Sequence, residues 1–403
     1  MKTIEGAHHL ENILLFTIFS SYFLPVLRVS ESLLLKIDDF IIIGVLPLFL
    51  IYRPKFVKNP ILSSLFVCLL FITLSTIFGY SLLNVPVSSR DLNEIIRLSK
   101  PILLILMLLS CDTEYVFEKV EKFITPLSWT IIFIAVLQYF NFLNIGRVLS
   151  SFYASDHHVQ NMVGSSHRIM VFGSDPNVGA AITMMFFLYH LFKGMFLKKK
   201  ASILLTFLLV IVVLMTSSRT SFIALAISLL VFLLSSPNIK LIPKLIFSLF
   251  IAGVIVFLYE KFNYIAVGFA LAVEGENNSV LHRFEKWIAA WNLFLQSPIL
   301  GWGLAKGSML TTVDGEYLLL LRRYGVIGTL SIMMSIIYMP FWKRNKNNVK
   351  ASQKLLVWDS TLRYYLIVII MVMVTNSFFS GYQLFLPFVF MCTLLYKERL
   401  KHA

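Results

Sequence analysis

Charged residues are scarce in this 403-residue chain, and their scarcity excludes an ordinary soluble domain. Asp, Glu, Lys and Arg make up 14% of the sequence, whereas hydrophobic residues make up 58%. A soluble protein of this size carries roughly 25% charged residues. Apolar runs close to the ~20 residues needed to cross a bilayer recur along the whole sequence. The composition therefore predicts a polytopic membrane protein.

Cysteine is also rare, and no metal-binding spacing occurs. Cys68, Cys111 and Cys392 lie in or at the end of apolar runs, which excludes a disulfide framework and indicates small core residues. The alternating pattern of an outer-membrane barrel is missing, so the spans are expected to be helices. No nucleic-acid-binding motif accompanies the net charge of +14, so nucleic acid is not an expected partner.

The apolar runs predict an all-α membrane protein of about twelve transmembrane helices with two substantial outward-facing loops. Residues 1–259 are expected to hold the first nine helices, with one outer loop near 144–174. Residues 260–316 form the larger outer loop, and residues 317–403 hold the last three helices and a tail. The expected spans are 13–27, 33–52, 61–83, 97–111, 123–143, 175–193, 201–216, 220–236, 244–259, 317–341, 363–380 and 383–396.

Basic residues fix the expected orientation, because Lys and Arg prefer short cytoplasmic loops. With the N-terminus inside, the main basic clusters fall on one side of the membrane. They lie at 53–58, 193–200, 240–244, 343–354 and 397–401. Both termini are therefore predicted to be cytoplasmic, and the net positive charge is interpreted as a topology signal.

Arg219 stands on the opposite, outer side, in a tight turn between two apolar runs. Its neighbours are the hydroxyl residues Ser217, Ser218, Thr220 and Ser221, and a helix begins at the same point. Helix N-termini attract anions, and an arginine fork bonds phosphate oxygens in pairs. An interfacial arginine that snorkels to water is the alternative interpretation.

Two further arginines, Arg168 and Arg283, are predicted on the outer side as well. Three outer arginines near the membrane surface suggest a polyanion held at the lipid boundary. A lipid-linked pyrophosphate fits, since its polyprenyl tail lies in the bilayer and its charged group lies at the interface.

The densest polar group in the chain lies between Arg283 and Gly328, at the end of the larger outer loop. Trp287 and Trp302 in this stretch either stack on sugars or anchor the chain at the interface, and the sequence leaves both readings open. Two carboxylates, Asp314 and Glu316, stand where the next helix starts.

Several segments, taken in their order, resemble the O-antigen polymerase and O-antigen ligase (Wzy/WaaL) superfamily of bacterial membrane glycosyltransferases. About twelve helices with one large late outer loop resemble it too, so the resemblance spans most of the chain. The segments are Arg168 with Phe172-Gly-Ser-Asp-Pro-Asn177, Ser217-Ser-Arg219-Thr-Ser221, Arg283-x-x-x-Trp287, Pro298-Ile-Leu-Gly301-Trp-Gly303, and Asp314-Gly-Glu-Tyr-Leu318 leading to Tyr324-Gly325-Val-Ile-Gly328.

The resemblance implies a GT-C-like bundle in the bacterial inner membrane, with the two large outer loops and the active site periplasmic. It implies transfer of a glycan from undecaprenyl pyrophosphate to a hydroxyl of a second lipid-linked repeat unit. Arg219 and Arg283, with Arg168 third, would bind the leaving pyrophosphate, and Asp314 or Glu316 would act as base. One base suits an inverting displacement, and the scheme requires no metal or cofactor.

The position of Asp314 favours a polymerase over a ligase. Ligases of this superfamily usually carry His followed by Asn just before the Tyr-Leu helix, whereas this chain has Asp314 and Gly315. The alternatives are an O-antigen ligase, which transfers glycan to the lipid A core, and a lipid-linked oligosaccharide flippase. Transporters usually show internal repeats and charges near the midplane, and neither is evident here. A chain-length regulator is a further possible partner of a polymerase.

Overall fold

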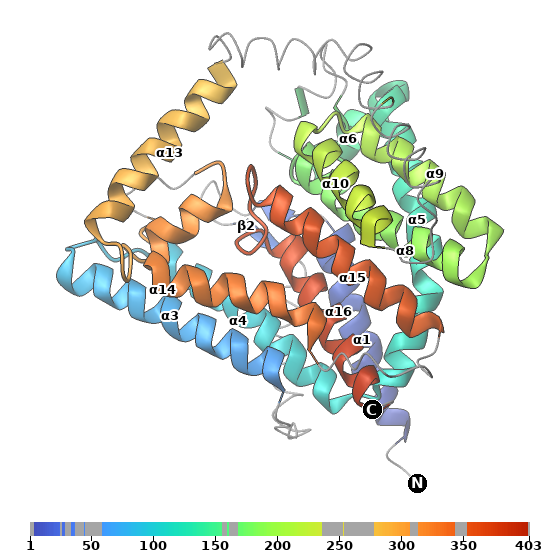
Figure 1. The fold of residues 1–403 in the computed structure, drawn as a ribbon, viewed down its shortest axis with the longest axis horizontal. Helices are drawn as coiled ribbons and strands as arrows, with labels where there is room; N and C mark the ends of the chain where they lie inside the picture. The colour runs from blue at the N-terminus through green and yellow to red at the C-terminus, as the bar shows by residue number, and fades with distance from the viewer. Residues whose placement is uncertain are drawn as a thin grey trace.

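The computed structural model describes residues 4–24, 26–28, 34–36, 44, 59–154, 159–160, 168–235, 253, 278–306, 313–342 and 353–401. These residues are predominantly helical (Figure 1). One short antiparallel pair joins β1 (Val26–Arg28) to β2 (Leu34–Lys36). The predicted spans 33–52 and 244–259 lie outside the described residues, apart from β2 and two isolated positions.

Short turns join several of the described helices. These helices are α1 (Ile4–Phe23), α3 (Pro60–Leu82), α4 (Ser89–Ser110), α5 (Thr113–Phe140), α6 (Ile145–Ser151), α8 (Pro176–Leu197), α9 (Lys200–Met215), α10 (Arg219–Ser235), α13 (Asn278–Gln296), α14 (Glu316–Tyr338), α15 (Gln353–Val372) and α16 (Tyr382–Lys401). Two of them, α6 and α13, lie in the segments expected to be outer loops. Two 3-10 turns, η1 (Phe142–Asn144) and η2 (Met339–Phe341), follow α5 and α14.

Five described helices are long and apolar enough to cross a membrane, which supports the expected class. They are α3, α5, α8, α14 together with η2, and α15, whereas α9 and α10 are shorter apolar helices. The predicted helical character is confirmed. The count of twelve spans and the large outer loop remain predictions.

Local sequence explains where two of these spans begin. Asn59 accepts the backbone N–H groups of Ile61 and Leu62, and Pro60 occupies the first helical turn of α3. Asp175 caps α8 in the same way, followed by Pro176. Proline is tolerated at this position because its missing N–H would have no partner inside the helix.

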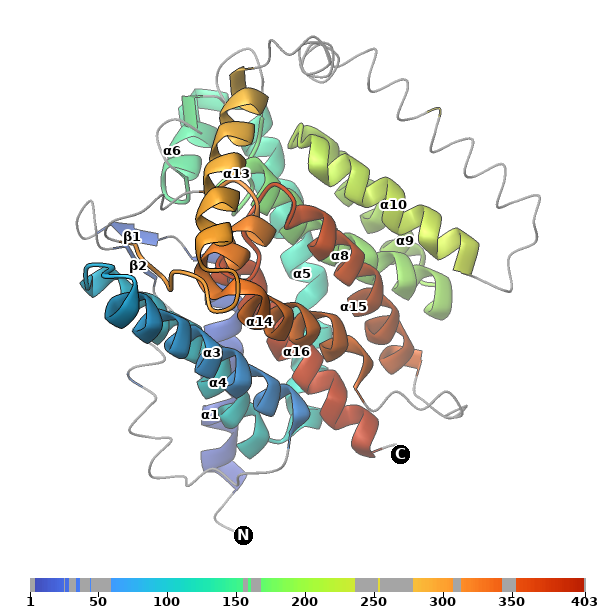
Figure 2. The same cartoon turned by 60° about the vertical axis from the view of Figure 1, so that its left-hand side comes forward.

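α8 is the most buried of the five candidate spans. Its neighbours include α9, α10 and α15, and aromatic contacts such as that between Tyr189 and Trp358 tie it to α15. Figures 1 and 2 both place the two chain termini together at one end of the bundle. The opposite end, where α8, α10 and α14 begin, carries the candidate site.

The span predicted at 363–380 is displaced in the structure. α15 runs from Gln353 to Val372, and residues 373–380 form a turn-rich loop before α16. Apolar residues of this loop, such as Phe378 and Phe379, are buried. Because these side chains are apolar, the loop has the hydropathy of a membrane span without being a helix. We call residues 373–380 the α15–α16 loop.

α14 is broken at Gly325, where φ is 60° and ψ is −167°. The carbonyl groups of Arg322 and Arg323 accept hydrogen bonds from the backbone of Trp302 and Gly303, at 2.9 and 2.8 Å. Across the break, the backbone N–H of Val326 donates to the carbonyl of Pro298, at 2.8 Å. Buried backbone groups need hydrogen-bond partners. Residues 297–303 thus supply the backbone partners that an unbroken helix would provide within itself.

Replacing Gly325 with alanine is expected to destabilise the protein markedly. The required backbone conformation is essentially restricted to glycine, and strain of this kind costs about 1–3 kcal/mol. An added Cβ would also overlap the carbonyl group of Ile299. Thermal unfolding of the purified variant in detergent measures the loss. Gly253→Ala is the matched control, since a Cβ there has no atom of the described residues within 4 Å; equal melting temperatures for both variants would contradict this account of the break.

Candidate functional site

Arg283 and Asp314 meet at the start of α14. Arg283 Nε lies 3.6 Å from Asp314 Oδ2, and Lys286 Nζ lies 3.9 Å from the same oxygen. The indole of Trp287 donates to the backbone carbonyl of Asp314. The Asp314 side chain is 40% exposed and that of Arg283 is 32% exposed. α13 and the start of α14 therefore form a group with two cations, a carboxylate and an aromatic ring, open to solvent.

Glu316 lies only two residues further along but in a different environment. Its side chain is fully buried. One carboxylate oxygen accepts the backbone N–H groups of Phe378 and Phe379, and the other accepts both the backbone N–H and the hydroxyl of Ser380. Glu316 therefore fixes the α15–α16 loop to the first turn of α14.

The same loop also contacts Gly315, whose φ of 123° favours glycine. A Cβ at this position would lie 2.8 Å from the carbonyl oxygen of Val374. The backbone N–H of Glu316 donates to the carbonyl of Met373, at 2.8 Å. The glycine thus permits the close approach that holds the Asp314 turn against the loop.

The residue that follows Arg219 contacts the α15–α16 loop. The hydroxyl of this residue, Thr220, is 2.9 Å from the hydroxyl of Thr375. Val374, the residue before Thr375, approaches Gly315, so the residues next to Arg219 and Asp314 contact adjacent positions of the loop. Arg219 is itself half-buried and opens α10.

A polar network fixes the turn that carries Arg219. The Ser218 hydroxyl donates to Asn177 Oδ1, at 2.6 Å, and accepts the backbone N–H of Ser221, at 3.2 Å. The Asn376 side chain donates to the Asp175 carboxylate, at 3.1 Å. The N-termini of α8 and α10 are thereby joined to each other and to the α15–α16 loop, which brings positive helix-dipole ends to one place.

Arg168 lies beside the same turn. The backbone N–H of the next residue, Ile169, donates to the carbonyl of Met215 at the end of α9, at 3.4 Å. Gln138 of α5 holds the following backbone through Met170 and Val171. Arg168 is half-buried. Three predicted arginines therefore lie at one end of the bundle, with Arg168 and Arg219 on neighbouring segments.

Trp302 is placed apart from this group. Its indole donates to the carbonyl of Leu293 on α13, at 2.7 Å, and its backbone is bonded to Arg322. Its carbonyl also packs against Gly79 of α3. These contacts fix α13 and the 297–303 segment onto α3 and α14.

Sequence inspection missed a second charged cluster, which lies between α4 and α14. Lys306 Nζ is 2.6 Å from Glu94 Oε2, and Arg323 Nη1 is 3.9 Å from the other Glu94 oxygen. Asp91 accepts the Lys306 backbone N–H, at 2.9 Å. Burial lowers the pKa of the Lys306 ammonium, and the charge of Glu94 opposes this change. The pattern Asp91-x-x-Glu94 in the sequence was the available signal.

Replacing either Glu94 or Lys306 alone is expected to destabilise the protein more than replacing both. Glu94 is almost fully buried, so Lys306→Met removes its nearest cation and leaves Arg323 at 3.9 Å, whereas Glu94→Gln leaves two cations without this carboxylate. The coupling energy of such neighbours is typically about 0.5–3 kcal/mol. Thermal unfolding of both single variants and the double variant measures it. Additive losses would contradict a direct ion pair.

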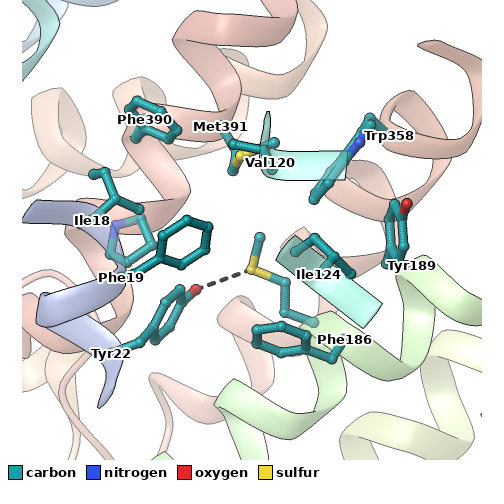
Figure 3. Close-up of a pocket in the computed structure, with 12 residues that line it drawn as sticks. Ile18, Phe19, Tyr22, Val120, Ile124, Phe186, Tyr189, Trp358, Phe390 and Met391 are labelled. Carbon is teal, nitrogen blue, oxygen red and sulfur yellow. Dashed lines mark hydrogen bonds between the residues drawn. The ribbon is translucent and has the colours of Figure 1, made fainter. Parts of the chain in front are cut away.

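The described residues also line a partly open apolar pocket among α1, α5, α8, α15 and α16 (Figure 3). Phe19, Phe186 and Trp358 contribute rings to its wall, and the Tyr22 hydroxyl donates to the sulfur of Met185, at 3.0 Å. Its lining residues include no carboxylate and no arginine, and their polar groups include the hydroxyls of Tyr22 and Tyr189. Within the described ranges, no three His, Cys, Asp or Glu side chains gather so as to hold a metal ion.

A family model gives an independent assignment for the middle of the chain. Residues 204–333 match the model described as O-Antigen ligase (Wzy_C). No curated protein matches the chain. All the predicted site residues except Arg168 lie within the matched range, and the α15–α16 loop lies outside it. The apolar helices and this match indicate a bacterial membrane protein that carries an O-antigen ligase family domain, consistent with the O-antigen polymerase and ligase (Wzy/WaaL) superfamily of membrane glycosyltransferases.

Proposed function

We propose that this protein is a polysaccharide polymerase that joins repeat units carried on undecaprenyl pyrophosphate, at the periplasmic face of the inner membrane. The observation that carries the proposal is the Arg283–Asp314 pair at the start of α14, linked through the α15–α16 loop to Arg219. The pair combines a carboxylate that can accept a proton with cations that can bind a leaving phosphate.

The arginines bind the pyrophosphate of the donor. Arg219 lies at a helix N-terminus beside Thr220 and Ser221, and Arg283 and Lys286 lie on α13. Fixed positive groups of this kind stabilise the charge that develops as the bond from the sugar C1 to the phosphate oxygen breaks. Arg168 adds a third cation from the segment beside the α9–α10 turn.

Asp314 acts as the general base, in preference to Glu316. Asp314 is partly exposed, so an acceptor hydroxyl can reach its carboxylate, and Arg283 and Lys286 lie beside it. Glu316 is buried and already accepts four hydrogen bonds. Asp314 accepts the proton of the acceptor hydroxyl while that oxygen bonds to C1 on the face opposite the leaving group. The undecaprenyl pyrophosphate departs with the bonding electron pair, and the configuration at C1 inverts.

Glu316→Gln is expected to reduce stability rather than to remove the base. Every contact of this carboxylate is with a donor, so the NH₂ group of glutamine would face N–H or O–H groups. The melting temperature and the yield of folded protein should fall, while the activity per folded molecule and its pH profile should change little. A fully folded variant without activity would assign Glu316 to the chemistry instead.

An O-antigen ligase is the second candidate, because the matched family model carries that description. A ligase shares the donor and differs in the acceptor, a sugar of the lipid A core. The deletion phenotype separates the functions. A lipid A core bearing one repeat unit indicates a polymerase, a bare core indicates a ligase, and cytoplasmic build-up of lipid-linked units indicates a flippase. A chain-length regulator would be a partner of the polymerase only.

A further inference from the structure

α13 presents an exposed apolar stripe along one side. Leu281, Phe284, Ile288, Trp291 and Leu295 recur at spacings of three and four residues, and all five are exposed. Spacing of this kind places side chains on one face of a helix. An uncovered row of large apolar side chains marks an interaction surface.

The other faces of α13 have different surroundings. The face opposite the stripe packs on the start of α14, where Ala290 and Phe294 are buried and Arg283 meets Asp314. One flank of the stripe carries the exposed polar residues Glu285, Asn292 and Gln296. A helix with a buried face, an apolar face and a polar flank fits a position where protein, hydrocarbon and water meet.

The direction of α13 agrees with that position. In Figures 1 and 2, α13 lies at the end of the bundle away from the chain termini and runs at a steep angle to α3, which is apolar enough to span a membrane. A helix that is steeply inclined to a membrane span lies closer to the membrane plane.

Exposed apolar residues also occur beyond the stripe. The next exposed apolar residue, Ile299, belongs to the segment that bonds to α14, and its carbonyl accepts the backbone N–H of Ile327, at 3.4 Å. Val326, Ile327 and Leu330 of that span are themselves exposed. Exposed apolar residues therefore occur on α13, at Ile299 and on the candidate membrane span to which Ile299 is bonded.

We propose that α13 is an interfacial helix whose stripe is embedded in the hydrocarbon edge of the adjacent membrane leaflet. This position would set the depth of Arg283 and Asp314, on the opposite face, at the level of the lipid headgroups. The inference relies on the proposed function only to identify the leaflet as the periplasmic one. A second copy of the chain is the competing occupant of the stripe.

Spin labels test the proposal in the full-length chain reconstituted in phospholipid vesicles at low protein density. Ile288→Cys and Leu295→Cys carry labels on the stripe, and Glu285→Cys and Asn292→Cys are the matched controls on the polar flank. Cys68, Cys111 and Cys392 are replaced by alanine. Collision with oxygen, which concentrates in lipid, is compared with collision with a water-soluble nickel complex.

The stripe labels are expected to show a several-fold higher ratio of oxygen to nickel collision than the flank labels. Equal ratios, or a higher ratio at the flank, would overturn the proposal. Dipolar broadening between labels at position 288 of separate chains would assign the stripe to a second copy. Should the cysteine-free chain not fold, the labels go into a chain in which only the half-buried Cys111 is replaced, because Cys68 and Cys392 are buried. A failed collision test leaves the polymerase assignment standing, because polymer formation is measured separately.

Discussion

Arg219→Ala and Arg283→Ala are each expected to abolish long-chain polysaccharide while the protein still inserts in the membrane. Removal of one preorganised donor from a site that stabilises developing charge typically costs about 10²–10³-fold in rate. Chains grow by repeated transfer, so a loss of that size at each step leaves products of one or a few units. Electrophoresis of the polysaccharide from a complemented deletion strain measures the ladder.

Arg147→Ala is the matched control for these variants, since Arg147 is an exposed arginine on the short helix α6. It should give the wild-type ladder. Lysine at position 219 or 283 should restore part of the activity, because it keeps the charge and loses the paired geometry. A normal ladder from either alanine variant would remove that arginine from the pyrophosphate site.

Asp314→Asn is expected to inactivate the protein without unfolding it. A positioned base contributes typically about 10²–10⁴-fold, and asparagine cannot accept the acceptor proton. The bond from Trp287 to residue 314 uses the backbone carbonyl, so the local backbone contact survives the substitution. The yield, melting temperature and rate of repeat-unit transfer are measured on the same preparation.

Asn292→Asp is the control for this variant, because it changes the charge by one unit on the exposed flank of α13. It should retain activity. Asp314→Glu should recover part of the rate lost in Asp314→Asn, since it restores a carboxylate at a shifted position. An Asp314→Asn variant with the wild-type rate would place the base elsewhere.

The sequence predicted the elements that depend on local signals. The spans expected at 61–83 and 175–193 from apolar length begin within a residue or two of α3 and α8, which Asn59 and Asp175 cap in the structure. Apolar length indicated spans that include α5 and α14. These predictions succeeded because capping and hydropathy act over a few neighbouring residues.

The α15–α16 loop was not predicted, because its role arises from distant contacts. Its buried phenylalanines extended the apparent span to residue 380, whereas the helix ends at Val372. The loop meets Glu316, Thr220 and Asp175, which are far apart in the sequence. Neither the periodicity nor the composition of the loop predicts contacts with these distant residues.

The two candidate carboxylates could not be separated by sequence either. Asp314 and Glu316 stand two residues apart on either side of Gly315, and both precede the same apolar run. Their difference comes from the α15–α16 loop, which buries Glu316 and leaves Asp314 partly open. Likewise, the Gly325 break requires the 297–303 segment to dock, and that contact joins two separate motifs.

Reconstituted transfer tests the central claim most directly. The purified full-length protein in liposomes is given one lipid-diphosphate-linked repeat unit as both donor and acceptor, and the products are separated by mass. A polymerase yields a ladder of whole repeat multiples with one lipid diphosphate released for each bond formed, and Asp314→Asn yields none. The account would be contradicted if the protein left the single repeat unit unchanged but transferred it to lipid A core when that acceptor was supplied. That result would identify a ligase.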